Sequence, residues 1–405
     1  MQSWTQVDVP ELATPSPAPR VYDSASQSLR TLPTNREVSL YVCGITPYDA
    51  THIGHAATYL AFDTLIRVWR NSGAVVHYAQ NVTDVDDPLI ERAHQVGRNW
   101  QDIALEQTAL FRSDMEALRV IPPAHYIGAV ESIPLVVKRI HQLEDAGATY
   151  TLDGDIYYDI SKTDTLGTVA HLDPDAMNTV FAERGGDPHR AGKYHPLDAL
   201  LWRKEQPNDP SWKSDFGRGR PGWHIECAAI ALEYLGDTID VQGGGSDLMF
   251  PHHELSAAHA QTATGSQTFA HTYMHTGMVA LDGEKMSKSR GNLVFVSQLR
   301  EQGIDPMAIR LVILDHHYRR DWSWEHSDLV VAQNRLADWR KVFAAEAAAP
   351  SIIDDVVGVL SEDLDTPAAI TLIDDWVTRS LNGEQTSSHS PKYMAKLINS
   401  LLGIV

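Results

Sequence analysis

After a polar arm, the chain alternates between short apolar runs and longer stretches with helical spacing. Residues 40–42 form an apolar run typical of a buried strand. Apolar side chains then recur at helical spacing from Tyr59 to Trp69 and stop before Gly73. A second apolar run follows at residues 74–80. Strand, helix and strand in this order form a βαβ unit, which predicts an α/β fold with a doubly wound parallel sheet.

The pattern changes twice further along the chain. From a short strand predicted at residues 155–160, the sequence runs through a glycine-, proline- and histidine-rich stretch that favours an insertion. A strand pattern resumes at residues 199–203, and another covers residues 274–281. Beyond residue 296 the patterns are almost all helical. We therefore divide the chain into five parts: an N-terminal arm at 1–36, the first half of the sheet domain at 37–150, an inserted connective segment at 151–198, the second half of the sheet domain at 199–295, and a helical domain at 296–405.

Two histidines lie between the first predicted strand and its helix. His52 and His55 occupy the start of the helix, where backbone N–H groups and the helix dipole favour an anion. A histidine there can contact a phosphate and stabilise charge that develops in a transition state. Taken alone, the pair also fits a turn with two surface histidines, which is the commoner outcome for this spacing.

Three further polar segments follow predicted strands, at the carboxyl edge where doubly wound sheets bind ligands. Residues 81–87 form a turn after the second strand. The glycines at 243–245 leave room for a nucleotide, and Asp247 can accept hydrogen bonds from a ribose. Lys285 and Lys288 lie in a glycine-bounded loop that suits a polyphosphate, although two lysines alone more often belong to a solvated basic loop.

The chain has only two cysteines, Cys43 and Cys227. Cys43 follows the first strand, Cys227 lies on a helix and His252 opens another helix, so all three belong to the carboxyl edge of the predicted sheet. Two thiolates and an imidazole suit zinc and leave a fourth position open. The alternative is two unrelated buried thiols. Trp223 lies one helical turn before Cys227 and can form a wall of a thiol pocket.

Charge and composition narrow the class of partner. The net charge is −20, with 53 acidic and 33 basic residues, which weighs against broad nucleic-acid binding. From residue 351 onward, eight acidic residues stand against three basic ones. The chain has neither an apolar run near the ~20 residues of a membrane span nor a secretory signal pattern. We therefore expect a cytoplasmic protein that binds neither nucleic acid nor a membrane.

The combination of motifs is far more specific than any one of them. The histidine pair at 52–55, the glycine–aspartate turn and the Lys-Met-Ser-Lys-Ser loop at 285–289 resemble the nucleotide-binding domain of class I aminoacyl-tRNA synthetases, so the sheet domain is expected to bind nucleotide. Segments 43–55, 81–87, 222–227 and 247–254 resemble cysteinyl-tRNA synthetase in particular. The resemblance covers about residues 37 to 380 and implies a zinc ion held by Cys43, Cys227 and His252.

Three features depart from the synthetase pattern. Its fourth zinc ligand is a glutamate, and Ser256 occupies that position here. The synthetase has an anticodon-binding region after its helical domain, whereas this chain ends at Val405 with an acidic tail. Residues 183–188, Glu-Arg-Gly-Gly-Asp-Pro, resemble a hallmark of a related family, the cysteine:glucosaminyl-inositol ligases of mycothiol biosynthesis. The sequence does not decide whether residues 183–188 serve acceptor binding or loop closure.

This second resemblance implies a reaction in two steps. ATP, with magnesium, activates L-cysteine as cysteinyl-AMP, and the amine of glucosaminyl-inositol then takes the cysteinyl group. His52, His55, Lys285 and Lys288 would act on the ATP phosphates. The residues expected around the cysteinyl-adenylate are Cys43, Gly44, Ile45, Thr46, Thr58, Asn81, Val82, Thr83, Trp223, Gly245, Ser246, Asp247 and Val279. Two alternatives remain: a shortened cysteinyl-tRNA synthetase paralogue that acts on tRNA, and a non-catalytic zinc- or nucleotide-sensing module.

Overall fold

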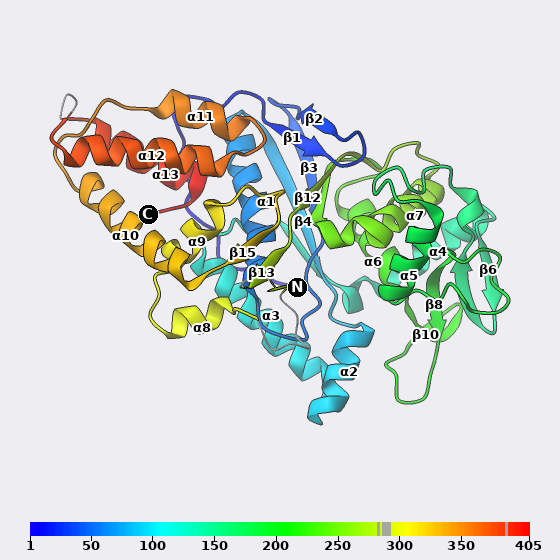
Figure 1. Ribbon diagram of the computed structural model, residues 1–405. Coiled ribbons are helices and arrows are strands. Elements are labelled where there is room, and N and C mark those ends of the chain that lie inside the picture. Colours follow the sequence, from blue (N-terminus) through cyan, green and yellow to red (C-terminus); the bar gives the residue numbers. More distant parts are fainter. Residues whose placement is uncertain (282–283, 286–292, 385–387) are drawn as a thin grey trace.

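A five-stranded parallel sheet forms the centre of the molecule. The computed structural model describes residues 1–281, 284–285, 293–384 and 388–405 (Figure 1). The strand order is β12-β11-β3-β4-β5, and every neighbouring pair is parallel. The strands are β3 (Glu37–Val42), β4 (Val75–Val82), β5 (His125–Gly128), β11 (Ile239–Gly245) and β12 (Ala270–Thr276). The predicted doubly wound α/β sheet is confirmed, and its order reverses at β3, where such sheets bind ligands.

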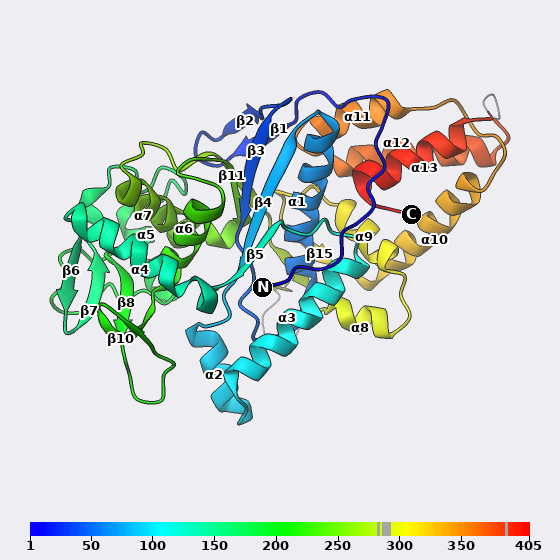
Figure 2. The same ribbon diagram turned by 180° about the vertical axis from the view of Figure 1, so that it is seen from behind.

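Helices cover both faces of this sheet and form two hydrophobic cores. The helix α1 (Ile53–Asn71) packs on one face, and α4 (Ala129–Asp145), α6 (Trp223–Tyr234) and α7 (Glu254–Thr264) cover the other (Figures 1 and 2). Successive residues of β3 point alternately to the two faces. Leu40 and Val42 enter the core shared with α1, whereas Tyr41 and Cys43 enter the core shared with α6.

A second, antiparallel sheet is inserted between the two halves of the parallel one. Its order is β6-β7-β8-β10-β9. Its elements are β6 (Thr149–Leu152), β7 (Asp155–Tyr158), η1 (Ile160–Lys162), α5 (Pro174–Glu183), β8 (Ala199–Lys204), β9 (Trp212–Ser214) and β10 (Gly217–Pro221). The strand predicted at residues 199–203 therefore exists, but it pairs with β7 and β10. The chain re-enters the parallel sheet only through α6 and β11. The sequence pattern could not predict this, because an apolar run does not reveal which sheet a strand joins.

The N-terminal arm is more ordered than its composition indicates. It runs from beside α3 (Trp100–Ala117) to a hairpin of β1 (Arg20–Asp23) and β2 (Ser28–Thr31) (Figure 2). The buried Trp4 indole N–H donates to the Val120 carbonyl at 2.7 Å. Its ring meets Phe111 and Tyr126 edge-on at 5.8 and 5.7 Å. The arm is thus part of the core next to α1.

The strand predicted at residues 274–281 is split in two. β12 ends at Thr276, and β13 (Val279–Leu281) belongs to a small sheet with β14 (Glu284–Lys285) and β15 (Trp322–Trp324). A Cβ on the intervening Gly277 would lie 2.3 Å from the Arg320 carbonyl oxygen, so the backbones approach too closely here for any other residue.

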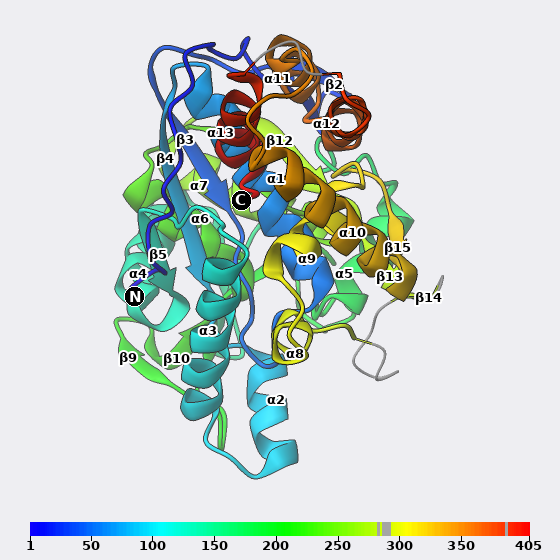
Figure 3. The same ribbon diagram turned by 90° about the vertical axis from the view of Figure 1, so that its left-hand side faces the viewer.

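The C-terminal region is helical, as predicted, and lies beside α1 (Figures 1 and 3). Its helices are α8 (Val296–Glu301), α9 (Pro306–Leu314), α10 (His326–Phe343), α11 (Ile353–Ser361), α12 (Thr366–Leu381) and α13 (Ser390–Leu402). The remaining elements are α2 (Asp87–Val96), η2 (Ser246–Leu248) and η3 (Met249–His253). None of the helices in the described ranges is long and apolar enough to cross a membrane.

A fully buried ion cluster joins this helical region to the sheet domain. The Asp63 carboxylate on α1 accepts from Arg67 Nε at 2.8 Å, from the Arg310 guanidinium on α9 and from the Ile121 backbone N–H at 2.8 Å. Arg67 also donates to carbonyls of α13 at Asn399 and Ser400. Burial alone would raise the pKa of Asp63, but the charges of Arg310 and Arg67 outweigh burial and lower it.

Candidate functional site

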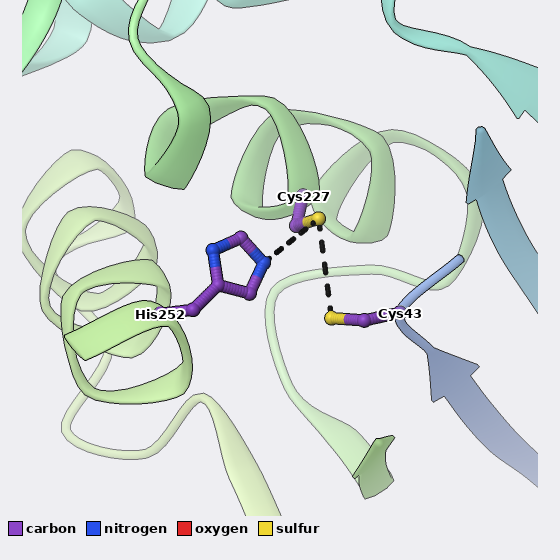
Figure 4. A group of neighbouring side chains, drawn as sticks. All are labelled: Cys43, Cys227 and His252. Atoms are coloured by element: carbon purple, nitrogen blue, oxygen red, sulfur yellow. Dashed lines mark hydrogen bonds between the residues drawn. The ribbon is translucent and has the colours of Figure 1, made fainter. Parts of the chain in front are cut away.

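Three potential metal ligands meet at the carboxyl edge of the parallel sheet. Cys43 follows β3, Cys227 lies on α6 and His252 lies in η3 (Figure 4). The two sulfur atoms are 3.9 Å apart, and His252 Nε2 is 3.2 Å from the Cys227 sulfur. All three ligand atoms lie within 4.8 Å of one another, and all three residues are buried. Since a disulfide requires about 2.05 Å, both thiols are free, and the three side chains can hold a metal ion together.

The environment of Cys227 favours its thiolate. Burial opposes ionisation, but the hydrogen bond with Cys43 and the charge and hydrogen bond of His252 outweigh it and lower the pKa of Cys227. Burial and the neighbouring Cys227 sulfur raise the pKa of Cys43. Two close sulfur atoms oppose each other's ionisation, so a cation between them would favour both thiolates.

Further histidines surround the three ligands. His253 Nε2 lies 3.2 Å from the Cys43 sulfur, and His253 Nδ1 lies 2.8 Å from His275 Nε2. His224 Nδ1 is 3.1 Å from His252 Nδ1. The Trp223 ring stacks on the His252 ring at 4.4 Å and 19°. The sequence analysis did not predict that His224 contacts His252 or that His275 contacts His253. These residues meet only through the order of the strands, which their spacing in the sequence does not show.

The Ser256 hydroxyl is engaged by the backbone. Ser256 is fully buried on α7, and its hydroxyl donates to the His224 carbonyl at 3.0 Å. The side chain thus holds the start of α6 in place.

We expect Ser256→Ala to leave metal binding by Cys43, Cys227 and His252 unchanged and to destabilise the fold by only about 0.5–1.5 kcal/mol, the net contribution of one hydrogen bond. The His224 carbonyl lies inside α6 and keeps its helical hydrogen bond. Elemental analysis and a denaturant titration measure the two quantities. Loss of metal from a variant that remains folded would show instead that Ser256 is a ligand.

His52 and His55 stack against each other at the start of α1. Their ring centroids are 3.8 Å apart, and His52 Nδ1 accepts the His55 backbone N–H at 3.4 Å, capping the helix. Burial and the neighbouring His55 lower the pKa of His52 to about 2, and burial lowers that of His55 to about 4. In the free protein at neutral pH both rings are therefore uncharged. Within the described residues, His55 Nδ1 is buried without a hydrogen-bond partner.

The turn after β3 packs closely against the end of β4. The Gly44 N–H and the Tyr41 hydroxyl donate to Asn81 Oδ1 at 2.7 and 3.1 Å. Asn81 Nδ2 donates to the Thr83 hydroxyl at 3.1 Å. A Cβ on Gly44 would lie 1.6 Å from the Asn81 carbonyl oxygen, so only glycine fits.

A cavity of about 740 Å³ connects the metal ligands with the start of α1. Most of the residues predicted from the sequence line it: Cys43, Gly44, Ile45, Thr46, His55, Thr58, Asn81, Thr83, Trp223, Cys227, Gly245, Asp247 and His252. Four other predicted residues are not in the lining. Val82 and Ser246 lie between lining residues in the chain, His52 stacks on His55, and Val279 lies in β13 of the small sheet. Lys285 is placed by its backbone in β14. Lys288 lies outside the described residues.

The inserted segment supplies another wall of the cavity. Residues 183–187, whose role the sequence left open, line it together with Tyr157 and Arg190. Arg184 Nη1 donates to the Asp247 carbonyl at 2.7 Å and lies 3.6 Å from the Asp247 carboxylate. The inserted segment therefore contacts the glycine–aspartate turn directly.

The sequence of the chain matches a family model over most of its length. Residues 30–334 match the model described as "tRNA synthetases class I (C) catalytic domain". This match covers well over half of the chain, and the chain belongs to the class I tRNA synthetase family.

Full-length relatives within this family share one name. Proteins from Kribbella flavida, Rhodococcus erythropolis and Thermomonospora curvata are 54%, 53% and 52% identical to this chain. Each alignment covers 100% of this chain and at least 99% of the relative. All three are called L-cysteine:1D-myo-inositol 2-amino-2-deoxy-alpha-D-glucopyranoside ligase.

Solved structures confirm the fold. Mycobacterium tuberculosis methionyl-tRNA synthetase, in complex with methionyl-adenylate, superposes with a TM-score of 0.63 at 14% identity, covering 91% of this chain and 92% of that one. A LeuRS from Agrobacterium radiobacter K84 in a ternary complex gives a TM-score of 0.62 at 12% identity, with 91% and 82% covered. At these identities the likeness concerns architecture alone.

Proposed function

We propose that this protein is an ATP-dependent, AMP-forming ligase that joins L-cysteine by an amide bond to the amine of glucosaminyl-inositol. One structural observation carries the proposal: a buried Cys-Cys-His cluster and His55, at the start of α1, line one cavity of about 740 Å³. The shared name of relatives that are about half identical over the whole chain supports the choice of acceptor.

The ligand set fits zinc. Two sulfurs, each about 2.3 Å from a tetrahedral zinc, lie about 3.8 Å apart, and the Cys43 and Cys227 sulfurs are 3.9 Å apart. Zinc bound by these three residues would keep a position for the thiolate of substrate cysteine, which separates cysteine from serine. Trp223, stacked on His252, would form a wall beside that thiol.

The residues around the cavity serve the first step. The cysteine carboxylate attacks the α-phosphate of magnesium-bound ATP, which forms cysteinyl-AMP and releases pyrophosphate. His52 and His55, at the N-terminus of α1, would stabilise the charge on the transferring phosphate. Lys285 and Lys288 would hold the β- and γ-phosphates. The backbone between Gly44 and Thr46, with Asn81, Thr83 and Asp247, would then position the adenylate.

The second step consumes the adenylate. The unprotonated amine of the acceptor attacks the acyl carbon, AMP leaves, and the amine gives up a proton to solvent. Holding amine and acyl carbon in one cavity replaces a slow bimolecular encounter.

A direct assay tests the proposal. Wild-type protein incubated with cysteine, ATP and magnesium is expected to release AMP when glucosaminyl-inositol is added and to yield the amide, detected by mass spectrometry. With tRNA in its place, no cysteinyl-tRNA should form, since the eight acidic residues after position 351 repel an RNA backbone. Charged tRNA without amide would identify a cysteinyl-tRNA synthetase paralogue, and no cysteine-dependent pyrophosphate release would leave only a binding module.

A further inference from the structure

One wall of the cavity comes from the inserted segment and packs against η3. It consists of the end of α5 and the turn after it, residues 183–187, backed by Tyr157 of β7. None of the adenylate contacts expected from the sequence belongs to the inserted segment. The wall formed by residues 183–187 has no place in that first step.

This turn is held rigidly. Gly185 has a φ of +85°, and a Cβ on Gly186 would lie 2.5 Å from the Phe181 ring. The Asp187 carboxylate accepts from the Tyr157 hydroxyl and from Lys193 Nζ at 2.9 Å. With Arg184 tied to the Asp247 carbonyl, the turn is fixed at both ends, which is the preorganisation that a binding wall needs.

The charges on this side of the cavity do not suit a phosphate. Every arginine in the lining already has a partner: Arg184 with Asp247, Arg190 with Asp155, Arg203 with Asp87, and Arg220 with Asp87 and Asp209. By contrast, within the described part of the chain, the carboxylate of Glu183 has neither a hydrogen bond nor an ion pair. A free carboxylate accepts hydrogen bonds and repels anions, so this wall favours a ligand with hydroxyl groups.

We propose that residues 183–187 form the acceptor subsite and that the Glu183 carboxylate binds hydroxyl groups of the amino-sugar acceptor. This inference rests on the proposed ligase function and adds where its second substrate binds. The acceptor then lies between the inserted sheet and the adenylate, with its amine directed toward the acyl carbon above the metal ligands. Glu183 acts in binding, and Arg184 is a positioning residue.

The test separates the two half-reactions. In the full-length, metal-loaded protein, Glu183→Ala is expected to leave cysteine-dependent ATP–pyrophosphate exchange within about twofold of wild type and to raise the KM for glucosaminyl-inositol at least about tenfold, the usual effect of losing a hydrogen bond to a charged group. Glu183→Gln keeps one acceptor oxygen and should restore part of that loss.

Glu91 provides a matched control. It lines the same cavity from α2 and, among the described residues, also has no partner. Glu91→Ala should change the acceptor KM less than about twofold. The proposed acceptor subsite is wrong if Glu183→Ala leaves the KM for glucosaminyl-inositol unchanged, or if Glu91→Ala raises this KM more than Glu183→Ala does. Neither result would contradict the ligase function. Wild-type protein that exchanges pyrophosphate but forms no amide refutes the ligase function itself.

Discussion

Cys227→Ser is expected to abolish binding of the proposed metal and to reduce cysteine-dependent ATP–pyrophosphate exchange more than about 100-fold. Loss of a residue that only contacts a metal ligand already costs about 10–100-fold. A serine hydroxyl is a far weaker acid than a thiol, and, against the effect of burial, Cys43 and His252 lower the pKa of the Cys227 thiol further. The variant would leave only Cys43 and His252, two of the three side chains that approach one another within 4.8 Å. Elemental analysis and the exchange assay measure the two losses.

The same variant separates chemistry from folding. The substitution replaces only a sulfur atom by an oxygen atom, so the far-ultraviolet circular dichroism of Cys227→Ser should match that of wild type. Ser256→Ala, equally buried on the neighbouring α7, serves as the control that keeps metal and activity. Full exchange activity in a metal-free Cys227→Ser protein would rule out the proposed role of the metal in selecting cysteine.

Asp63→Asn is expected to lower the free energy of unfolding by about 3–5 kcal/mol, because it leaves the buried guanidinium groups of Arg67 and Arg310 without their counter-charge. Both ion pairs have side chains that are 0% exposed. Urea titrations of the two proteins measure the difference. Glu106→Gln, which breaks the exposed ion pair with Arg98, should leave the midpoint almost unchanged.

The effect of Asp63→Asn depends on pH in a defined direction. The folded-state pKa of Asp63 is lowered, so its contribution is present above the unfolded-state pKa of about 3.9 and is lost as the pH falls through the lower folded value. The difference between the variants should therefore be constant near neutral pH and shrink below about pH 4. A difference that grows on acidification would contradict this account.

The parallel sheet could be predicted from the sequence because its strands are apolar runs that alternate with amphipathic helices. The same pattern predicts that Cys43, Cys227 and His252 lie at the carboxyl edge of the sheet. In the structure their ligand atoms lie within 4.8 Å of one another. Sequence patterns did not separate β12 from β13, since only the close approach of Gly277 to Arg320 divides them.

Other parts of the site depend on contacts that no local pattern records. Arg184 reaches Asp247 across 63 positions of the chain, and His275 reaches His253 through the neighbouring strand β12. Assigning β8 to the inserted sheet required its partners, β7 and β10. Long-range pairing of this kind decides the shape of the cavity wall, and a single sequence contains little information about it.

The alternation along β3 ties the metal chemistry to strand register. The Cys43 N–H pairs with the Gly243 carbonyl at 3.0 Å, and its side chain faces α6 only because it lies an even number of residues from Tyr41. Deleting one residue from β3 would place Cys43 where Val42 now lies, facing α1, and would leave Gly44, which has no side chain, beside Cys227 and His252. The two hydrophobic layers would remain, but the proposed metal site would lose one ligand. The register of β3 therefore fixes the proposed amino-acid specificity as well as the packing of the sheet.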